Sequence, residues 1–102
     1  MRLIDASKKH GHQEAVFEIG KEKIPVLVRL LGEAEYTEAM NTFGSGDNVA
    51  AAKMLASIFI NPSDMKPAVT SAELRSDDFK NADIMRLFNL FCDVNNGNKE
   101  GN

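Results

Sequence analysis

The chain has few of the features that would cross-link it by disulfides or anchor it in a membrane. Cys92 is the single cysteine among 102 residues, so no disulfide can close within the chain and a reducing compartment is expected. No apolar run approaches the roughly 20 residues that a membrane-spanning helix needs. The opening segment, Met1 to Asp5, is too short and too polar for a signal peptide. We therefore expect a cytoplasmic protein without a membrane partner.

Clustered positive charge is missing as well. The chain carries 12 Lys and Arg against 15 Asp and Glu, which gives a net charge of -3 and a pI near 5.3. Its basic residues are scattered, whereas a nucleic-acid-binding surface normally shows a basic stripe that neutralises phosphates. This distribution argues against DNA or RNA as the main partner.

The sequence contains no set of residues with the types and spacing of an active site or a metal centre. His10 and His12 would need two further Cys or His ligands for a closed zinc site, and Cys92 alone does not supply them. Cys92 also lies in an apolar stretch that disfavours a thiolate. The segment 44–47 precedes a predicted helix but lacks the lysine and the length of a phosphate-binding loop. We therefore predict no enzymatic activity, no cofactor and no metal.

What the chain does contain is an ordinary globular balance, with 43% hydrophobic and 26% charged residues. Its length fits one domain. Residues 1–13 show little periodicity and are expected to form a flexible arm, while residues 14–95 form a single α+β domain. From Asn95 onward the chain is polar, and residues 96–102 are expected to form a flexible tail.

Two apolar runs, Ala15 to Ile19 and Ile24 to Leu31, flank the polar segment 20–23 and predict a β-hairpin. A slip of one residue would turn the apolar side chains outward, so agreement on both faces favours one register. Pro25 lacks an N–H group and should lie at an edge or point away from the ladder. With a four-residue loop, the predicted pairs are Ile19–Ile24, Phe17–Val26, Ala15–Val28, Val16–Leu27 and Glu14–Arg29.

Helical periodicity follows the hairpin. Apolar residues at offsets 0, 3, 4 and 7 predict a helix over Glu33 to Phe43, and Asp47 or Ser45 can cap a second helix that runs to about Ile60. Thr70 and Glu73 have the spacing of a capping box for a short helix. The segment 76–78 can cap a last helix, from about Phe79 to Val94. The prediction is therefore a mostly helical α+β fold, an N-terminal β-hairpin followed by three to four packed α-helices.

This arrangement leaves more apolar surface than the predicted neighbours cover. A lone hairpin is marginal in water, and the last helix has apolar residues beyond a single stripe. Either a compact fold buries all of them, or some form a surface for self-association or partner binding. The candidate residues for such a surface are Val16, Leu27, Met85, Leu90 and Phe91.

Three segments resemble the tail assembly chaperones of long-tailed, siphophage-type bacteriophages. They are Ile24 to Tyr36, the helix stop Asn61-Pro62, and Thr70 to Leu74 with its continuation into Ala82 to Leu87. The resemblance implies a protein that forms homo-oligomers, binds and protects the tape measure protein in the host cytoplasm, and recruits tail tube subunits. It also implies release before maturation, so that the mature virion lacks the protein.

In this family, ribosomal frameshifting near the 3′ end of the gene commonly adds a longer product. The polar tail fits the start of such an extension and equally fits an ordinary C-terminus. The alternative is a small phage or bacterial regulatory or adaptor protein that binds a host protein or nucleic acid.

Overall fold

An N-terminal hairpin and a set of helices share one apolar core in the computed structural model, which describes residues 1–97. This confirms the predicted α+β fold with an N-terminal hairpin. In chain order the elements are α1 (Leu3–Lys9), β1 (His12–Ile19), β2 (Glu22–Arg29), α2 (Glu33–Phe43), α3 (Asn48–Ala56), β3 (Phe59–Ile60), α4 (Ser71–Leu74) and α5 (Asn81–Asn95).

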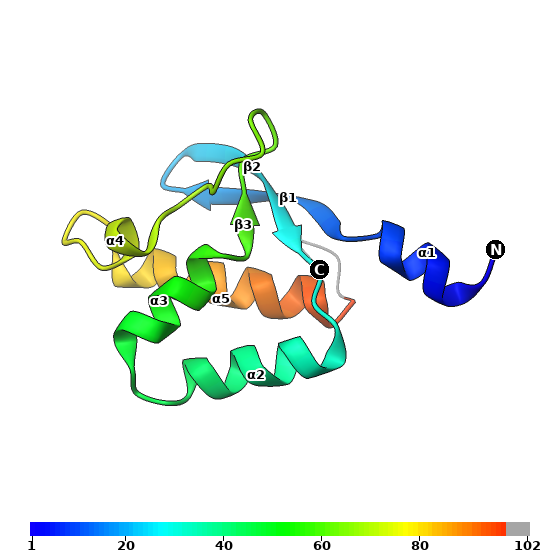
Figure 1. Ribbon diagram of the computed structural model, residues 1–102. Helices are drawn as coiled ribbons and strands as arrows, with labels where there is room; N and C mark the ends of the chain where they lie inside the picture. The colour runs from blue at the N-terminus through cyan, green and yellow to red at the C-terminus, as the bar shows by residue number, and fades with distance from the viewer. Residues whose placement is uncertain (98–102) are drawn as a thin grey trace.

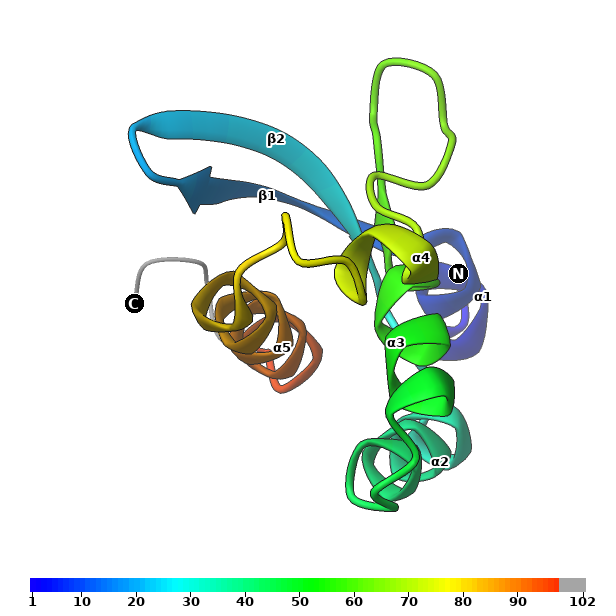
Figure 2. The same ribbon diagram turned by 90° about the vertical axis from the view of Figure 1, so that its left-hand side faces the viewer.

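The sheet forms one layer, with α5 beneath the hairpin and α2 farther from the sheet, while α1 projects to the side (Figure 1). Turned by 90°, the molecule shows α3 and α4 to one side of α5 (Figure 2). β1 and β2 pair antiparallel, and β3 adds to the other edge of β2. The core therefore lies between the inner face of the sheet and the helices, and its largest fully buried side chains are Val28, Ile58, Phe59 and Phe91.

The hairpin pairs in a register that differs by two residues from the predicted one. Gly20 and Lys21 alone form the loop, so Ile19 lies opposite Glu22. Side chains alternate between the faces with a period of two, so this shift leaves every residue on its predicted face. In place of the predicted pairs, the structure has Phe17–Ile24, Ala15–Val26, Val16–Pro25, Glu14–Leu27 and His12–Arg29.

Gly20 explains why the loop is shorter than expected. Its φ of +60° at the first position of a two-residue hairpin loop is the requirement of a type II′ turn, which glycine meets without a steric penalty. A four-residue loop that includes Gly20 predicts the other register, so the difference of two residues comes from the loop length.

We expect Gly20→Ala to lower the free energy of unfolding by about 1–2 kcal/mol, because an L-residue is disfavoured at this φ. Among residues 1–97, no heavy atom outside Gly20 and its two chain neighbours lies within 4 Å of the added Cβ, so the penalty comes from the backbone conformation. Urea denaturation of the variant checks the value. Gly11→Ala, which has equal space and no positive φ, should change stability by less, and an equal loss in both variants would contradict the turn assignment.

Pro25 lies where its missing donor has no consequence. β3 pairs with Leu27 and Val28 only, so within residues 1–97 the outer edge of β2 at Pro25 has no neighbouring strand. The edge placement predicted for this residue is therefore confirmed locally, although β2 is the central strand of the sheet.

The predicted helix to Ile60 ends earlier. α3 stops at Ala56, and Phe59–Ile60 forms the short strand β3. The N-terminal end of α3 agrees with the prediction, because the Asp47 side chain accepts hydrogen bonds from the backbone N–H groups of Val49 and Ala50. Phe59 is 1% exposed, so the apolar residues that resemble a helix face instead join the core through the sheet.

Of the two remaining predictions of a helix start, one is confirmed and one is wrong. The capping box of Thr70 and Glu73 is present at α4, with both reciprocal hydrogen bonds formed. By contrast, α5 begins only after Lys80, which makes no side-chain cap. The expected cap from residues 76–78 is therefore wrong.

The segment expected to be an arm contains the helix α1, which has no buried residue, and β1 begins at His12 rather than Glu14. At the other end, α5 continues through Asn95, which the sequence reasoning placed at the start of the polar tail. Residues 98–102 of the expected tail lie outside the described residues.

Candidate partner-binding groove

α5 carries the widest apolar arc of the fold, and the structure divides this arc between two environments. Leu87, Leu90, Phe91 and Val94 are buried in the core, because α5 lies against β1 and the inner face of the sheet. Ile84 and Phe88 are half-buried, and Met85 is 51% exposed. These three residues face away from the sheet and line a groove.

An aromatic cluster fixes one end of the groove. The ring of Phe43, at the end of α2, lies 5.2 Å from Phe88 and 5.7 Å from Phe91, both in edge-on contact. Tyr36 stacks on the other side of Phe91 at 5.6 Å. Such offset and edge-on pairs add to the energy of burial, so α2 and α5 are held together on the side of the groove that faces the core.

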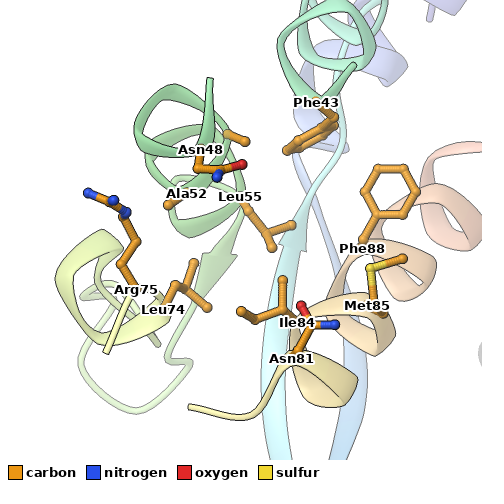
Figure 3. A pocket seen from close by; sticks show the side chains of 11 residues that line it. Phe43, Asn48, Ala52, Leu55, Leu74, Arg75, Asn81, Ile84, Met85 and Phe88 are labelled. Carbon is orange, nitrogen blue, oxygen red and sulfur yellow. The ribbon is translucent and has the colours of Figure 1, made fainter. Parts of the chain in front are cut away.

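The groove lies between α3, α4 and α5 and has a volume of about 490 Å³. In Figure 3, Leu55 from α3, Leu74 from α4 and Ile84 from α5 point toward one another across its floor, while Met85 and Phe88 form one wall. Its complete lining is Phe43, Asn48, Ala51, Ala52, Leu55, Leu74, Arg75, Asn81, Ile84, Met85 and Phe88.

Small residues on α3 leave this space open. Ala51 and Ala52 both belong to the lining, and their methyl groups are too short to fill the space beside α3. α3 packs on α2 and α4, whereas α5 packs on β1. The groove is thus the space that remains between α3 and α4 on one side and α5 on the other.

The border of the groove is polar and its interior is apolar. Asn48, Arg75 and Asn81 are the polar residues among the lining, and all three are exposed. A small-molecule site usually places a few polar groups inside an apolar pocket to orient the ligand. Here the polar groups stay at the mouth, which suits apolar side chains of a protein partner rather than a polar metabolite.

A second, smaller hollow of about 330 Å³ lies on the outer face of the hairpin. Val16 is 40% exposed there, and the other apolar residues of the lining are Ala15, Pro25, Val26, Leu27 and Pro62. Glu14 also lines the hollow. This hollow contains both hairpin residues that the sequence reasoning assigned to a partner-binding surface.

The five candidate residues therefore have three different positions. Val16 and Leu27 lie on the outer face of the hairpin, and Met85 lines the groove. The assignment of Leu90 and Phe91 to a partner-binding surface is corrected, because these side chains are 9% and 0% exposed. Both point into the core beneath the sheet, where a partner cannot reach them.

Leu55, Leu74 and Phe43 are groove residues that the sequence reasoning did not identify. Each belongs to the apolar face of a different helix, and nothing in a single-helix pattern distinguishes a groove residue from a core residue. The run of alanines in α3 is the one available signal, because small residues on an otherwise apolar face mark a place where packing is not filled.

Cys92 is half-buried. Burial raises the pKa of its thiol, Asp93 adds to the rise, and a hydrogen bond with Tyr36 opposes it. The thiol thus stays protonated at neutral pH, as expected from the apolar stretch around it.

Within residues 1–97, no three His, Cys, Asp or Glu side chains come together in a way that could hold a metal ion. Over the same residues, none of the helices combines the length and the apolar character that crossing a bilayer requires.

Comparison of the chain with protein-family models, with curated proteins and with solved structures finds no match. The assignment of function therefore depends on the groove and on the segments described above.

Proposed function

We propose that this protein is a phage tail assembly chaperone that binds an apolar helix face of the tape measure protein in the groove between α3, α4 and α5. The observation that carries the proposal is the open apolar groove itself, with Met85 half-exposed on its wall. The resemblance of three segments to tail assembly chaperones supplies the identity of the client.

Helix-in-groove binding matches the chemistry of such a client. A long helical protein without its tail tube exposes apolar stripes that would otherwise associate with one another. An amphipathic helix inserts side chains at positions i, i+3, i+4 and i+7 into an apolar groove. The flexible thioether of Met85 can adapt to different side chains in turn, which suits a chaperone that binds several turns of a long helix.

Two further parts of the proposal concern the other partners. The outer face of the hairpin, with Val16 and Leu27 around the smaller hollow, is the second surface available for recruitment of tail tube subunits or for self-association. Weak contacts repeated along the client give avidity while each contact stays reversible. Release by the polymerising tube, and hence absence from the mature virion, then requires no single tight interface to break.

Met85→Glu tests the groove directly. A carboxylate on the groove wall would have to lose its water when an apolar helix docks. We expect at least a tenfold loss of the tape measure protein that copurifies with this chain after coexpression of the two genes from the same phage. Met85 is 51% exposed, so thermal unfolding of the variant should stay close to that of the wild type.

Asn89→Glu is the matched control, because it adds the same charge to an exposed position of the same helix outside the groove lining. It should copurify with the tape measure protein as the wild type does. Equal binding by all three proteins would reject the groove as the client site. No tape measure binding by the wild type, together with salt-sensitive retention on DNA, would instead favour the adaptor role.

A further inference from the structure

Met85 makes one wall of the groove open to oxidation. It is the one methionine among the residues that line the groove, and it is 51% exposed on the wall that it forms with Phe88 (Figure 3). A small oxidant in solution can therefore reach its side chain while the protein stays folded. A thioether needs no deprotonation to react with a peroxide, so this exposure alone makes the sulfur of Met85 a target.

The other sulfur atoms of the chain are buried, unreactive or outside the groove. Met40 and Met54 are half-buried and pack against the core. Met1 and Met65 are 87% and 58% exposed, but neither lines the groove. Burial raises the pKa of the Cys92 thiol, so little of the thiolate that peroxides attack exists at neutral pH. A peroxide thus has a single accessible sulfur within the groove.

Oxidation would make this wall polar. The thioether sulfur attacks one oxygen of hydrogen peroxide, so that an S–O bond forms as the O–O bond breaks. The sulfur loses two electrons to the peroxide, whose second oxygen leaves as water after a proton transfer. The product, methionine sulfoxide, is polar and chiral. The floor beside it is formed by Leu55, Leu74 and Ile84, whose side chains offer no hydrogen-bond donor, so docking of an apolar helix would remove water from the new oxygen without replacing it.

We infer that Met85 is a redox switch of the groove, which binds its client helix while Met85 is a thioether and loses the client when hydrogen peroxide converts it to the sulfoxide. This inference rests on the proposed function, because it concerns the regulation of the same groove. The switch is reversible. A methionine sulfoxide reductase supplied with a dithiol returns the thioether, while the dithiol becomes a disulfide and the oxygen leaves as water.

The test oxidises the full-length chain alone with hydrogen peroxide, removes the peroxide with catalase, and adds the chain to a cell-free translation of the tape measure protein. Peptide mass spectrometry should find the added oxygen on Met85 at a dose that leaves Met40 and Met54 unmodified. We expect the oxidised wild type to copurify at least about fivefold less tape measure protein than the untreated wild type. Methionine sulfoxide reductase with dithiothreitol should restore binding, whereas dithiothreitol alone should not.

Met85→Leu is the decisive variant, because it keeps an apolar side chain of similar volume and removes the sulfur. It should bind the client as the wild type does, both before and after peroxide. Met65→Leu is the matched control, since it makes the same change at an exposed methionine outside the groove lining. It should remain as sensitive to peroxide as the wild type. Thermal unfolding of the oxidised wild type should stay close to that of the untreated protein, because half of the Met85 side chain already faces solvent.

The possible failures of the switch and of the proposed function differ. An unmodified Met85 in the folded chain, unchanged binding by the oxidised wild type, an equal loss in oxidised Met85→Leu, or a loss of folded structure on oxidation of Met85 would each overturn the switch and leave the proposed function in place. No client binding by the untreated wild type would instead reject the proposed function, and the switch would fall with it.

Discussion

Replacing Phe91 with alanine is expected to lower the free energy of unfolding by about 3–5 kcal/mol, the usual range for truncation of a fully buried phenylalanine. Phe91 is 0% exposed, and its ring contacts those of Tyr36 and Phe43 at 5.6 and 5.7 Å. The variant would lose the burial of one ring and the packing of the two others, and it would leave a cavity where α2 meets α5.

Chemical denaturation followed by circular dichroism measures this loss, and Phe88→Ala is its matched control. Phe88 belongs to the same helix but is half-buried on the groove side, and its ring contacts Phe43 at 5.2 Å. We expect a clearly smaller loss for Phe88→Ala. If Phe88→Ala costs as much as Phe91→Ala, the division of α5 into a core side and a groove side is wrong.

The size of the Phe91 effect matters for any study of partner binding. A domain of this length has a total stability of about 5–15 kcal/mol, so Phe91→Ala removes a large part of it. A charged substitution at the buried Leu90 would be at least as damaging, because a carboxylate in the core loses its hydration without gaining a partner. Loss of binding in either variant would therefore report unfolding, and Met85 is the position that can separate binding from folding.

Prediction from the sequence worked best where local chemistry decides the structure. α2 spans Glu33–Phe43 as expected, because its apolar spacing and the glycine on each side of it point to the same limits. Thr70 and Glu73 likewise define the start of α4 through their own side chains. In both cases the signal lies within one turn or one face of the helix concerned.

Prediction failed where the sequence pattern is compatible with more than one arrangement. Alternation in the hairpin determined which face each residue occupies, but a shift of two residues preserves that alternation, so the loop conformation at Gly20 had to decide the register. The division of α5 has the same origin. Its periodicity groups Ile84, Leu87, Phe88 and Phe91 on one face, and only the positions of β1 and α3 separate core residues from groove residues.

The groove itself was beyond sequence reasoning for a related reason. It lies between α3, α4 and α5, so it is a property of how three helices are placed relative to one another. Met85 was identified as a candidate because the apolar arc of α5 exceeds what one neighbour covers. Nothing in that argument could select Leu55 and Leu74, which complete the floor from two other helices.

Asn95→Ala is the second variant with a large expected effect, a loss of about 2–3 kcal/mol in the free energy of unfolding. Its side-chain Oδ1 accepts a 2.8 Å hydrogen bond from the backbone N–H of Leu31, and its Nδ2 donates to the carbonyl of Arg29 at 3.0 Å. These bonds fasten the end of α5 to the chain between β2 and α2. Alanine would leave a partly buried donor and acceptor without partners, and each such group costs about 1–3 kcal/mol.

Asn96→Ala isolates this effect because it makes the same chemical change one residue later. Asn96 is exposed and makes one long hydrogen bond of 3.4 Å to the Tyr36 hydroxyl, so its loss should be within about 0.5 kcal/mol. Asn95→Asp keeps an acceptor for Leu31 but places a carboxylate oxygen against the carbonyl of Arg29, and it should be destabilised as well. Urea midpoints that are equal for Asn95→Ala and Asn96→Ala would mean that the tail begins at Asn95 and that α5 is held by its apolar face alone.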